Sequence, residues 1–492
     1  MTQWKQIYYK NLSIEVIALR YYIRCSMYKT IFFLLLSIFL LFSVNIGFAQ
    51  QPLSIKDAVR IGTENYPIIK SKVNQLNASK SYLKEQRAEN LPDINFSAQQ
   101  DYGTINGTNG PLYGYRGLSV ASSGPALSSQ NWNAAFGALY LTNVSWDFFA
   151  FGRARDKVNI QKSAVYRDQS DLNQEVFQHK IRIAASYLNL LAAQRIVKSQ
   201  QDNLNRSVEL RRVVVARVKN GLNPGVDSSL ANSEVSNARI ALTNAQQNEQ
   251  DQNNQLVQFL GIPVQQFALD SIFITGVPKT TDAVPTVTFQ NHPILQYYQS
   301  RVGVSDSQAK YYSKFALPTF SGFGVFQGRG SGFTPGVTTA APSIHTANYG
   351  DGVDPTRFNY LIGVAAVWNV SSLFRTHYQV ESQKYVSLQL KDEYELVSQR
   401  LQDQEALAET RISNSLKNYR EAPVEVKAAT DAYVQKGTLY RNGLSSIVDF
   451  TTALFNLNRA QIDRDIAYNN VWQAVLLKAA ATGDFDIFTN NL

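Results

Sequence analysis

The spacing of apolar residues switches from a helical period to a strand period early in the chain. Residues 54–65 and 68–90 carry apolar side chains at helical spacing, the first segment behind a Ser-x-x-Asp capping pattern and the second ending at a Leu-Pro pair. Apolar and polar residues then alternate over residues 94–99 and again over residues 136–148. This two-residue period predicts two strands, each with one apolar face.

A very long helix is predicted after the strands. Residues 153–220 contain neither glycine nor proline, and their apolar positions recur at helical spacing. A continuous helix of that length spans about 100 Å, which no globular domain requires. Gly221 suits the positive φ of a helix end, and Pro224 prevents continuation. The chain is therefore predicted to turn here and to return as a second helix over residues 226–260.

The second half of the chain repeats these landmarks. The phrase Asn-Gly-Leu occurs twice, each time with a Val-Asp pair at the same distance behind it. At a constant offset of 222 residues, Trp146 corresponds to Trp368, Arg153 to Arg375, Gly221 to Gly443, Asp227 to Asp449 and Gly261 to Gly483. Upstream, the Asn-Tyr-Pro and Leu-Pro sequences have counterparts at an offset of 226. The chain is therefore predicted to be a tandem duplication.

The change of offset is explained by one loop of different length, between Pro92 and Trp146, where insertions cost little. The predicted organisation is a signal peptide at 1–49, a first repeat at 50–262, a connecting segment at 263–279, a second repeat at 280–483 and a tail at 484–492. In the second repeat we expect strands over residues 320–326 and 358–370 and a long helix over residues 375–436 with a kink at Pro423.

The N-terminus has the pattern of an export signal. An apolar run at residues 31–44 follows a lysine and precedes small residues, which predicts cleavage after Ala49, with residues 1–26 an over-called start. The alternative, a membrane anchor, is weaker because the run falls short of the about 20 residues that cross a bilayer. The sole cysteine, Cys25, lies before the cleavage point, so the mature chain is predicted to be exported and free of thiols.

The amphipathic strands have two interpretations. Strands of about ten residues with an apolar face, a polar face and aromatic residues near their ends suit a membrane barrel, although a soluble sandwich also shows such alternation. The export signal favours the barrel. Four strands per chain leave two open edges in lipid, and three copies supply about twelve strands for closure. The predicted fold is therefore mainly α, with a membrane β-barrel shared by a homotrimer in outer-membrane lipid.

One polar stretch also has two interpretations. Residues 246–255 are polar on every side, which alone is typical of disorder. In an antiparallel coiled coil that faces water the same composition is tolerated, and we expect such a coiled coil in each repeat.

Composition and charge exclude several function classes. The formal charge is +9, but basic residues are spread through helical stretches, so no nucleic-acid partner is expected. The chain has no GxxxxGK[ST] sequence for nucleotide, and no His or Met cluster for a metal. The four histidines lie far apart, and His179, between Gln178 and Lys180, is predicted to lie on a helix surface. We therefore expect no enzyme and no cofactor.

The chain resembles the TolC-like outer-membrane efflux proteins. The resemblance covers nearly all of the mature chain: the phrase LSIKDAVRIGTENYP, the two Leu-Pro strand entries, the long helices and the paired Asn-Gly-Leu turns. It implies a passive exit duct of a tripartite efflux or type I secretion system, energised by an inner-membrane transporter, with helices that extend into the periplasm. A cell-surface structural coiled coil or adhesin is the alternative, but it leaves the amphipathic strands unexplained.

The resemblance also assigns roles to the two turns. In such proteins the glycine-centred turns lie at the periplasmic tip, where a periplasmic adaptor protein docks, and Gly221, Leu222, Gly443 and Leu444 match that motif. Glycine allows close backbone approach, and leucine presents an apolar side chain at an otherwise polar end. The alternative is that these residues only cap an ordinary helical hairpin.

A constriction is implied next to the second turn. Asp449 matches the first of two aspartate rings, where three copies favour cations and raise one another's pKa. The second ring position is Thr452, and the family's locking arginine falls at Ser445, whereas Asp227 matches its acidic partner. These departures predict that other contacts hold the channel in its closed state. Asp449 also suits the first turn of a helix, which is the alternative reading.

Overall fold

The computed structural model describes residues 52–106, 129–270, 273, 276, 278, 291–333 and 345–490. The predicted signal peptide and much of the predicted connecting segment lie outside these residues. Leu53 and Phe267–Leu269 belong to one compact unit, in which Leu53 and Leu269 form a parallel bridge. All other elements described below belong to a second unit.

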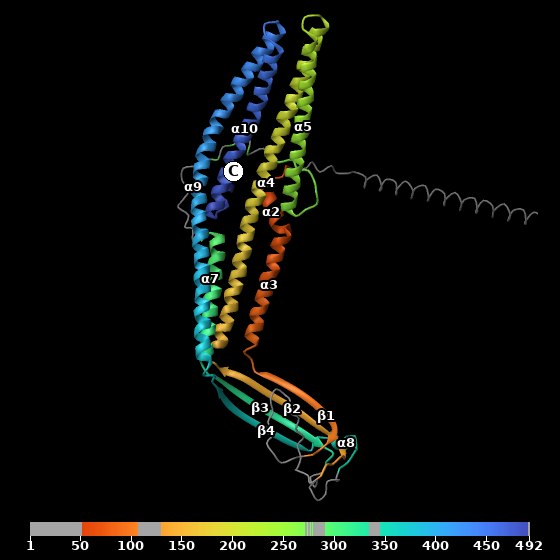
Figure 1. Cartoon of the computed structure of the whole chain (residues 1–492), viewed down its shortest axis with the longest axis vertical. Helices are drawn as coiled ribbons and strands as arrows, with labels where there is room; N and C mark the ends of the chain where they lie inside the picture. Colours follow the sequence, from red (N-terminus) through yellow and green to blue (C-terminus); the bar gives the residue numbers. More distant parts are fainter. Residues whose placement is uncertain are drawn as a thin grey trace, which may run out of the picture. The chain divides into compact units, whose positions relative to one another are not determined.

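Apart from the first helix of the first set, the described elements of the second unit form two sets in the same order. The first set is α2 (Ile55–Asn65), α3 (Pro67–Ala88), β1 (Asp93–Thr104), β2 (Ala134–Phe149), α4 (Arg153–Lys219) and α5 (Gly225–Leu260). The second set is α7 (Pro293–Ser313), β3 (Thr319–Ser331), β4 (Arg357–Val367), α9 (Ser372–Arg441) and α10 (Ile447–Thr482), with the short helices η2 (Lys314–Ala316), α8 (Tyr349–Val353) and α11 (Asp486–Thr489). The predicted duplication is confirmed in the order of elements (Figure 1).

Local sequence sets the ends of these helices as predicted. The Ser54 Oγ accepts a hydrogen bond of 3.1 Å from the Asp57 backbone N–H at the start of α2. Pro67 and Pro293 occupy the first helical positions of α3 and α7, where no backbone donor is needed.

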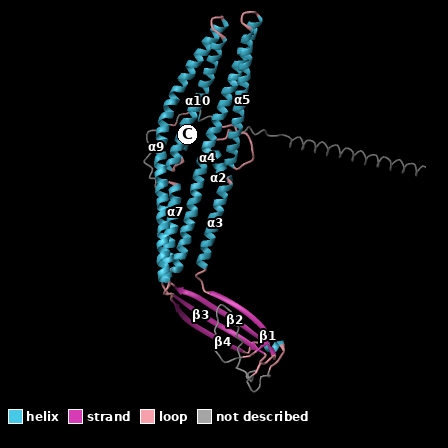
Figure 2. Cartoon of the chain, in the orientation of Figure 1, coloured by secondary structure: helices cyan, strands magenta, loops and turns pink. Residues whose placement is uncertain are grey.

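The long helices are continuous. Helix α4 has 67 residues, which corresponds to about 100 Å. Helix α9 has 70 residues and is continuous through Pro423, the position at which a kink was predicted. Helix α5 contains the polar residues 246–255, so this stretch is helical, as the coiled-coil interpretation requires, rather than disordered. Helix α4 pairs with α5 in a first hairpin, α9 pairs with α10 in a second, and α10 also packs on α4 (Figure 2).

The four strands form one antiparallel sheet in the order β1-β2-β3-β4. The β2–β3 pairing joins the two repeats, and β1 and β4 are the edge strands. Strand β4 ends at Val367, before the expected end at residue 370, because Ser372 and Leu373 donate backbone hydrogen bonds to Asn369 and Val370 in the turn into α9.

Equivalent contacts in the two repeats follow the sequence offsets. The Trp146 indole donates to the backbone oxygen of Asn90 at 2.9 Å, and the Trp368 indole donates to that of Ala316 at 3.1 Å. Each acceptor stands directly before a Leu-Pro pair. The two tryptophans therefore hold the same strand entry in each repeat.

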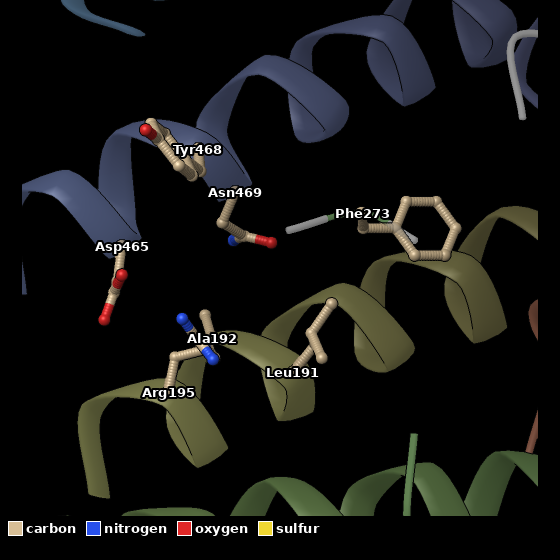
Figure 3. Close-up of a pocket in the computed structure, with 7 residues that line it drawn as sticks. All are labelled: Leu191, Ala192, Arg195, Phe273, Asp465, Tyr468 and Asn469. Atoms are coloured by element: carbon tan, nitrogen blue, oxygen red, sulfur yellow. The ribbon is translucent and has the colours of Figure 1, made fainter. Parts of the chain in front are cut away.

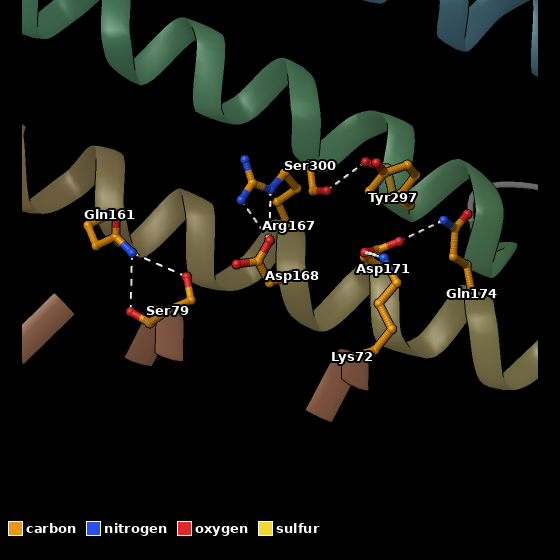
Figure 4. Close-up of polar contacts among 9 residues, drawn as sticks. All are labelled: Lys72, Ser79, Gln161, Arg167, Asp168, Asp171, Gln174, Tyr297 and Ser300. Carbon is orange, nitrogen blue, oxygen red and sulfur yellow. Dashed lines mark hydrogen bonds and ion pairs between the residues drawn. The ribbon is translucent and has the colours of Figure 1, made fainter. Parts of the chain in front are cut away.

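The best-packed core lies around the middle of α4. Ile183, Tyr187 and Leu188 are fully buried, as are Leu256 on α5 and Ala479 on α10. Helices α3 and α7 are tied to α4 by polar contacts, and Figure 4 shows those between α3 and α4. The Lys72 ammonium lies 2.5 Å from the Asp171 carboxylate, and Ser163 and Ser307 hydroxyls lie 3.0 Å apart.

The prediction of a surface position for His179 is wrong. Its side chain is fully buried, its ring stacks on Tyr66 at 3.8 Å between centroids, and its Nε2 lies 2.9 Å from the backbone oxygen of Phe259. Burial lowers the pKa of the imidazole, so the ring is neutral. The polar neighbours Gln178 and Lys180 misled the prediction, because residue 179 lies on the face of α4 that meets α2 and α5.

Candidate functional site

The first tip turn, residues 220–224, ends α4 in the way that its sequence predicts. Gly221 has φ +72°, its backbone N–H donates to Val218 at 3.0 Å, and the Leu222 N–H donates to Arg217 at 2.9 Å. This pattern is a left-handed cap in which the last carbonyls of the helix find donors. A β-carbon on Gly221 meets nothing within 4 Å, so the backbone conformation alone requires glycine here.

The second tip turn, residues 442–446, has the same geometry. Gly443 has φ +76°, its N–H donates to Tyr440 at 3.0 Å, and the Leu444 N–H donates to Leu439 at 2.9 Å. The repeated Asn-Gly-Leu phrase therefore encodes one backbone turn twice.

Apolar side chains project from both turns. Leu222 is 65% exposed and Leu444 is 74% exposed. Sequence reasoning missed Val226 and Val448, which begin the returning helices and are similarly exposed. The sequence signal for these valines was their spacing of 222 residues. An apolar residue at both equivalent positions of an otherwise polar helix end indicates a functional contact.

Arg217 connects the first tip turn to the second hairpin, and sequence reasoning missed it. Its Nε donates to the Asn223 side-chain oxygen at 2.7 Å within the first turn. Its Nη1 donates to the backbone oxygen of Arg441, and its guanidinium lies 5.5 Å above the Tyr440 ring, both in the second hairpin. No pattern reveals this role, because the counterpart of Arg217 at the offset of 222 is Leu439.

Asp227 lies in the contact between the hairpins. It is 9% exposed and accepts a hydrogen bond of 2.7 Å from the Asn223 side-chain amide, which also donates to the Tyr440 hydroxyl at 3.3 Å. Burial, and then the charge of Asp227, raise the pKa of Tyr440. Asp227 therefore belongs to the same network as Arg217.

Asp449 lies on the open side of the second hairpin. Its carboxylate accepts a hydrogen bond of 3.1 Å from Ser445 and lies 3.7 Å from the Lys436 ammonium, while its backbone N–H donates to the Ser446 cap. The Ser445 hydrogen bond, followed by the charge of Lys436, lowers the pKa of Asp449. Within one chain the pKa of Asp449 is therefore lowered, whereas three neighbouring aspartates are expected to raise it. Asp449 and Asp227 share none of these contacts.

A groove of about 650 Å³ runs along the second hairpin from Asp449. It is lined from α9 by Glu425, Ala428, Ala429, Ala432 and Lys436, and from α10 by Asp449, Thr452, Ala453, Asn456, Arg459 and Asp463. Small side chains form much of its α9 wall. Thr452, which occupies the position of the second aspartate in the TolC-like proteins, lies in the same groove as Asp449.

Other kinds of site were sought in the part of the chain that the structure describes. There, no three His, Cys, Asp or Glu side chains are grouped so that they could hold a metal ion. None of the described helices combines the length and apolar character needed to cross a membrane.

Comparisons with known proteins concern the fold of the chain. Residues 63–262 match the family model described as "Outer membrane efflux protein". No curated protein matches the chain. Among solved structures, the outer membrane protein VceC from Vibrio cholerae matches with TM-score 0.69 and 14% identity, covering 87% of this chain and 96% of that one.

Two further solved structures share the fold. The CmeC outer membrane channel of Campylobacter jejuni has TM-score 0.70 and 14% identity, over 87% of this chain and 85% of its own. CusC, described in terms of transmembrane channel formation, has TM-score 0.73 and 11% identity, over 90% and 96%. CmeC and CusC are both described as channels. Residues 63–262 are therefore similar to outer membrane efflux proteins, and most of the chain has the fold of these solved structures.

Proposed function

We propose that the protein is the passive outer-membrane exit duct of a tripartite efflux or type I secretion system, energised by an inner-membrane transporter. The observation that carries the proposal is the pair of tip turns with exposed leucines, at the ends of the long helices opposite those joined to the strands. The helices would extend into the periplasm. The alternative function, a cell-surface coiled coil, would leave the amphipathic sheet unexplained.

The sheet supports a homotrimer in outer-membrane lipid. Edge strands β1 and β4 each have one side without a partner strand in the described chain, and Phe96, Tyr360 and Ile362 on these strands are at least 79% exposed. Lipid does not tolerate open strand edges, because unpaired backbone groups cost several kcal/mol each. Three copies supply about twelve strands, enough for a closed barrel with a lumen.

The tip turns are proposed to bind a periplasmic adaptor protein. Replacing both Leu222 and Leu444 with serine is expected to weaken adaptor binding at least tenfold, because burying one leucine contributes about 1.5 kcal/mol or more. Binding of purified adaptor to immobilised channel measures the effect. Val264→Ser is the control, since Val264 is 76% exposed but lies away from both turns. Equal binding by the double variant and the control would remove the leucines from the interface.

The constriction at Asp449 is testable by conductance in planar bilayers. The wild type is expected to show cation-selective openings, and Asp449→Ala is expected to lower the ratio of cation to anion permeability several-fold, because three carboxylates are lost at the entrance. Glu209→Ala is the control, since Glu209 is an exposed acid on α4 paired with Arg212.

Two results would count against these assignments. Unchanged selectivity in Asp449→Ala would move the constriction elsewhere. Inserted wild-type protein without any conductance would contradict the channel itself.

A further inference from the structure

The charged side chains of the four strands all belong to one face of the sheet. Side chains alternate between the two faces along a strand, and the register joins residues of the same face across the strands. One face, called the polar face below, carries the charged residues Asp93, Asp101, Asp147, Arg329 and Arg357. The opposite face, called the apolar face, carries no charge and includes Ile94, Phe96, Val144, Phe326, Tyr360 and Ile362.

Two arginines stand directly opposite each other on the polar face. Arg329 of β3 and Arg357 of β4 are partners in the register, and both side chains are exposed. Directly opposite residues of antiparallel strands have β-carbons about 4.5–5.5 Å apart. The register continues from Arg329 to Leu139 on β2 and Gln99 on β1, which are uncharged. Both guanidinium groups can therefore reach one small ligand above the sheet.

The acids of α8 lie beside the apolar face. The Tyr140 hydroxyl, on that face, donates to the backbone oxygen of Val353 at 3.3 Å. A β-carbon on Gly330, also on that face, would lie 2.6 Å from the backbone oxygen of Asp354. Asp351 is part of α8, and Asp354 directly follows it. These two acids are therefore on the side of the sheet away from the arginine pair.

The acids of the polar face lie on other strands. Strands β3 and β4 contain the two arginines and no Asp or Glu. Asp101 accepts a hydrogen bond of 3.0 Å from the Gln99 side chain on β1, which β2 separates from β3. Two strand spacings are about 10 Å, a distance over which salt at about 0.1 M screens exposed charges. In the sequence, residues 105–133 and 332–348, which follow β1 and β3, contain no acid.

The arginine pair is not expected to stabilise the sheet, because like charges directly opposite each other weaken a strand pair. Elsewhere the chain sets opposite charges where two elements meet. The Arg301 guanidinium lies 2.6 Å from the Glu393 carboxylate between α7 and α9, and Arg195 and Asp465 line one small cavity between α4 and α10 (Figure 3). The departure from this pattern in the sheet indicates a role in binding.

Guanidinium groups select a particular chemistry of ligand. Each is planar, permanently charged and presents a fork of donors that matches the oxygens of a carboxylate or a phosphate. Two such groups on neighbouring strands can donate to the same oxyanion from two sides. A cation would be repelled by both.

We propose that Arg329 and Arg357 form an oxyanion site, which binds a carboxylate or phosphate group of a dissolved solute that passes through the duct. The inference rests on the proposed function, in which the polar face lines the lumen, and it adds a class of solute to that function. Because the apolar face is the one proposed to contact lipid, the occupant is a dissolved anion rather than a lipid headgroup. Three copies would bring six guanidinium groups to one level of the lumen.

Block of the channel by citrate, which carries three carboxylates, tests the site in planar bilayers. Citrate is added to both sides, and the wild type is expected to lose conductance as its concentration rises. In the double variant Arg329→Gln with Arg357→Gln, the citrate concentration for half block is expected to rise about tenfold or more, because charge-assisted hydrogen bonds to the anion are lost.

The matched control changes the next pair on the same face. Gln327 and Asn359 are partners in the register and carry no charge, so Gln327→Ala with Asn359→Ala is expected to be blocked like the wild type. The double variant Arg329→Lys with Arg357→Lys keeps the charge without the planar fork. Its half-block concentration is expected to lie between those of the wild type and the glutamine variant.

Equal block of the glutamine variant and the wild type would overturn the site and leave the duct intact, because the channel still conducts. Inserted protein without conductance would instead contradict the duct. An equal loss of block in the Gln327 and Asn359 control would also overturn the assignment to the arginines. The block is expected to persist in bilayers that contain anionic phospholipid. If it disappears there, a lipid phosphate occupies the arginines, and the dissolved occupant is wrong.

Discussion

Replacing Arg217 with alanine is expected to raise the single-channel conductance several-fold in planar bilayers. Arg217 joins the first tip turn to the second hairpin: it donates to Asn223 within the turn and contacts the Arg441 carbonyl and the Tyr440 ring across the hairpins. Hydrogen bonds from a charged group contribute about 1.5–3 kcal/mol when well ordered, and half-exposure reduces this value. A loss of about 1.4 kcal/mol shifts the balance between joined and separated tips tenfold.

Arg212→Ala is the matched control for this experiment. Arg212 lies on the same helix, is 77% exposed and pairs with Glu209 three residues away, so it connects nothing between hairpins. Its replacement is expected to leave the conductance unchanged. Equal conductance in Arg217→Ala and the wild type would show that other contacts hold the two tips together.

Arg217 also shows why part of the site escaped prediction. The resemblance places a locking arginine at the position of Ser445, and the sequence there indicates only that the lock is missing. In the structure Ser445 instead donates to Asp449 at the start of α10, and an arginine from the first repeat reaches across to the second hairpin. One of its acceptors is a backbone carbonyl, which every residue carries, so the pairing depends on how the hairpins pack and has no sequence pattern.

The features that were predicted correctly depend on local chemistry. Helical period, the absence of glycine and proline, and glycine at helix ends fix α4 and both tip turns without reference to the rest of the chain. The four strands follow from the two-residue period. His179 was misplaced because its burial is decided by α2 and α5, which lie far from it in the sequence.

Gly483→Ala is expected to destabilise the fold by about 2–4 kcal/mol. Gly483 ends α10 with φ +78°, a conformation that costs an alanine about 1 kcal/mol. A β-carbon there would lie 2.7 Å from the His292 ring and 3.0 Å from the His292 Cα. His292 is 1% exposed, and its Nε2 lies 3.1 Å from the Ala480 oxygen, so it has no room to move. Overpacking of this kind adds about 1–3 kcal/mol.

Gly443→Ala separates the two contributions to this loss. Gly443 has nearly the same φ, +76°, but a β-carbon there would meet only the end of the Arg217 side chain at 3.6 Å. Its replacement is expected to cost only the backbone term of about 1 kcal/mol. Urea unfolding in detergent, followed by the helical circular dichroism signal, compares the two variants.

An equal loss in both variants would mean that the contact with His292 contributes nothing. A larger loss for Gly483→Ala would show that glycine is required there by packing as well as by conformation. The first repeat provides an independent check, because a β-carbon on Gly261, at φ +64°, would lie 3.1 Å from the Asn65 backbone. Gly261→Ala should therefore behave like Gly483→Ala, and the duplicated glycine would have the same structural role in both repeats.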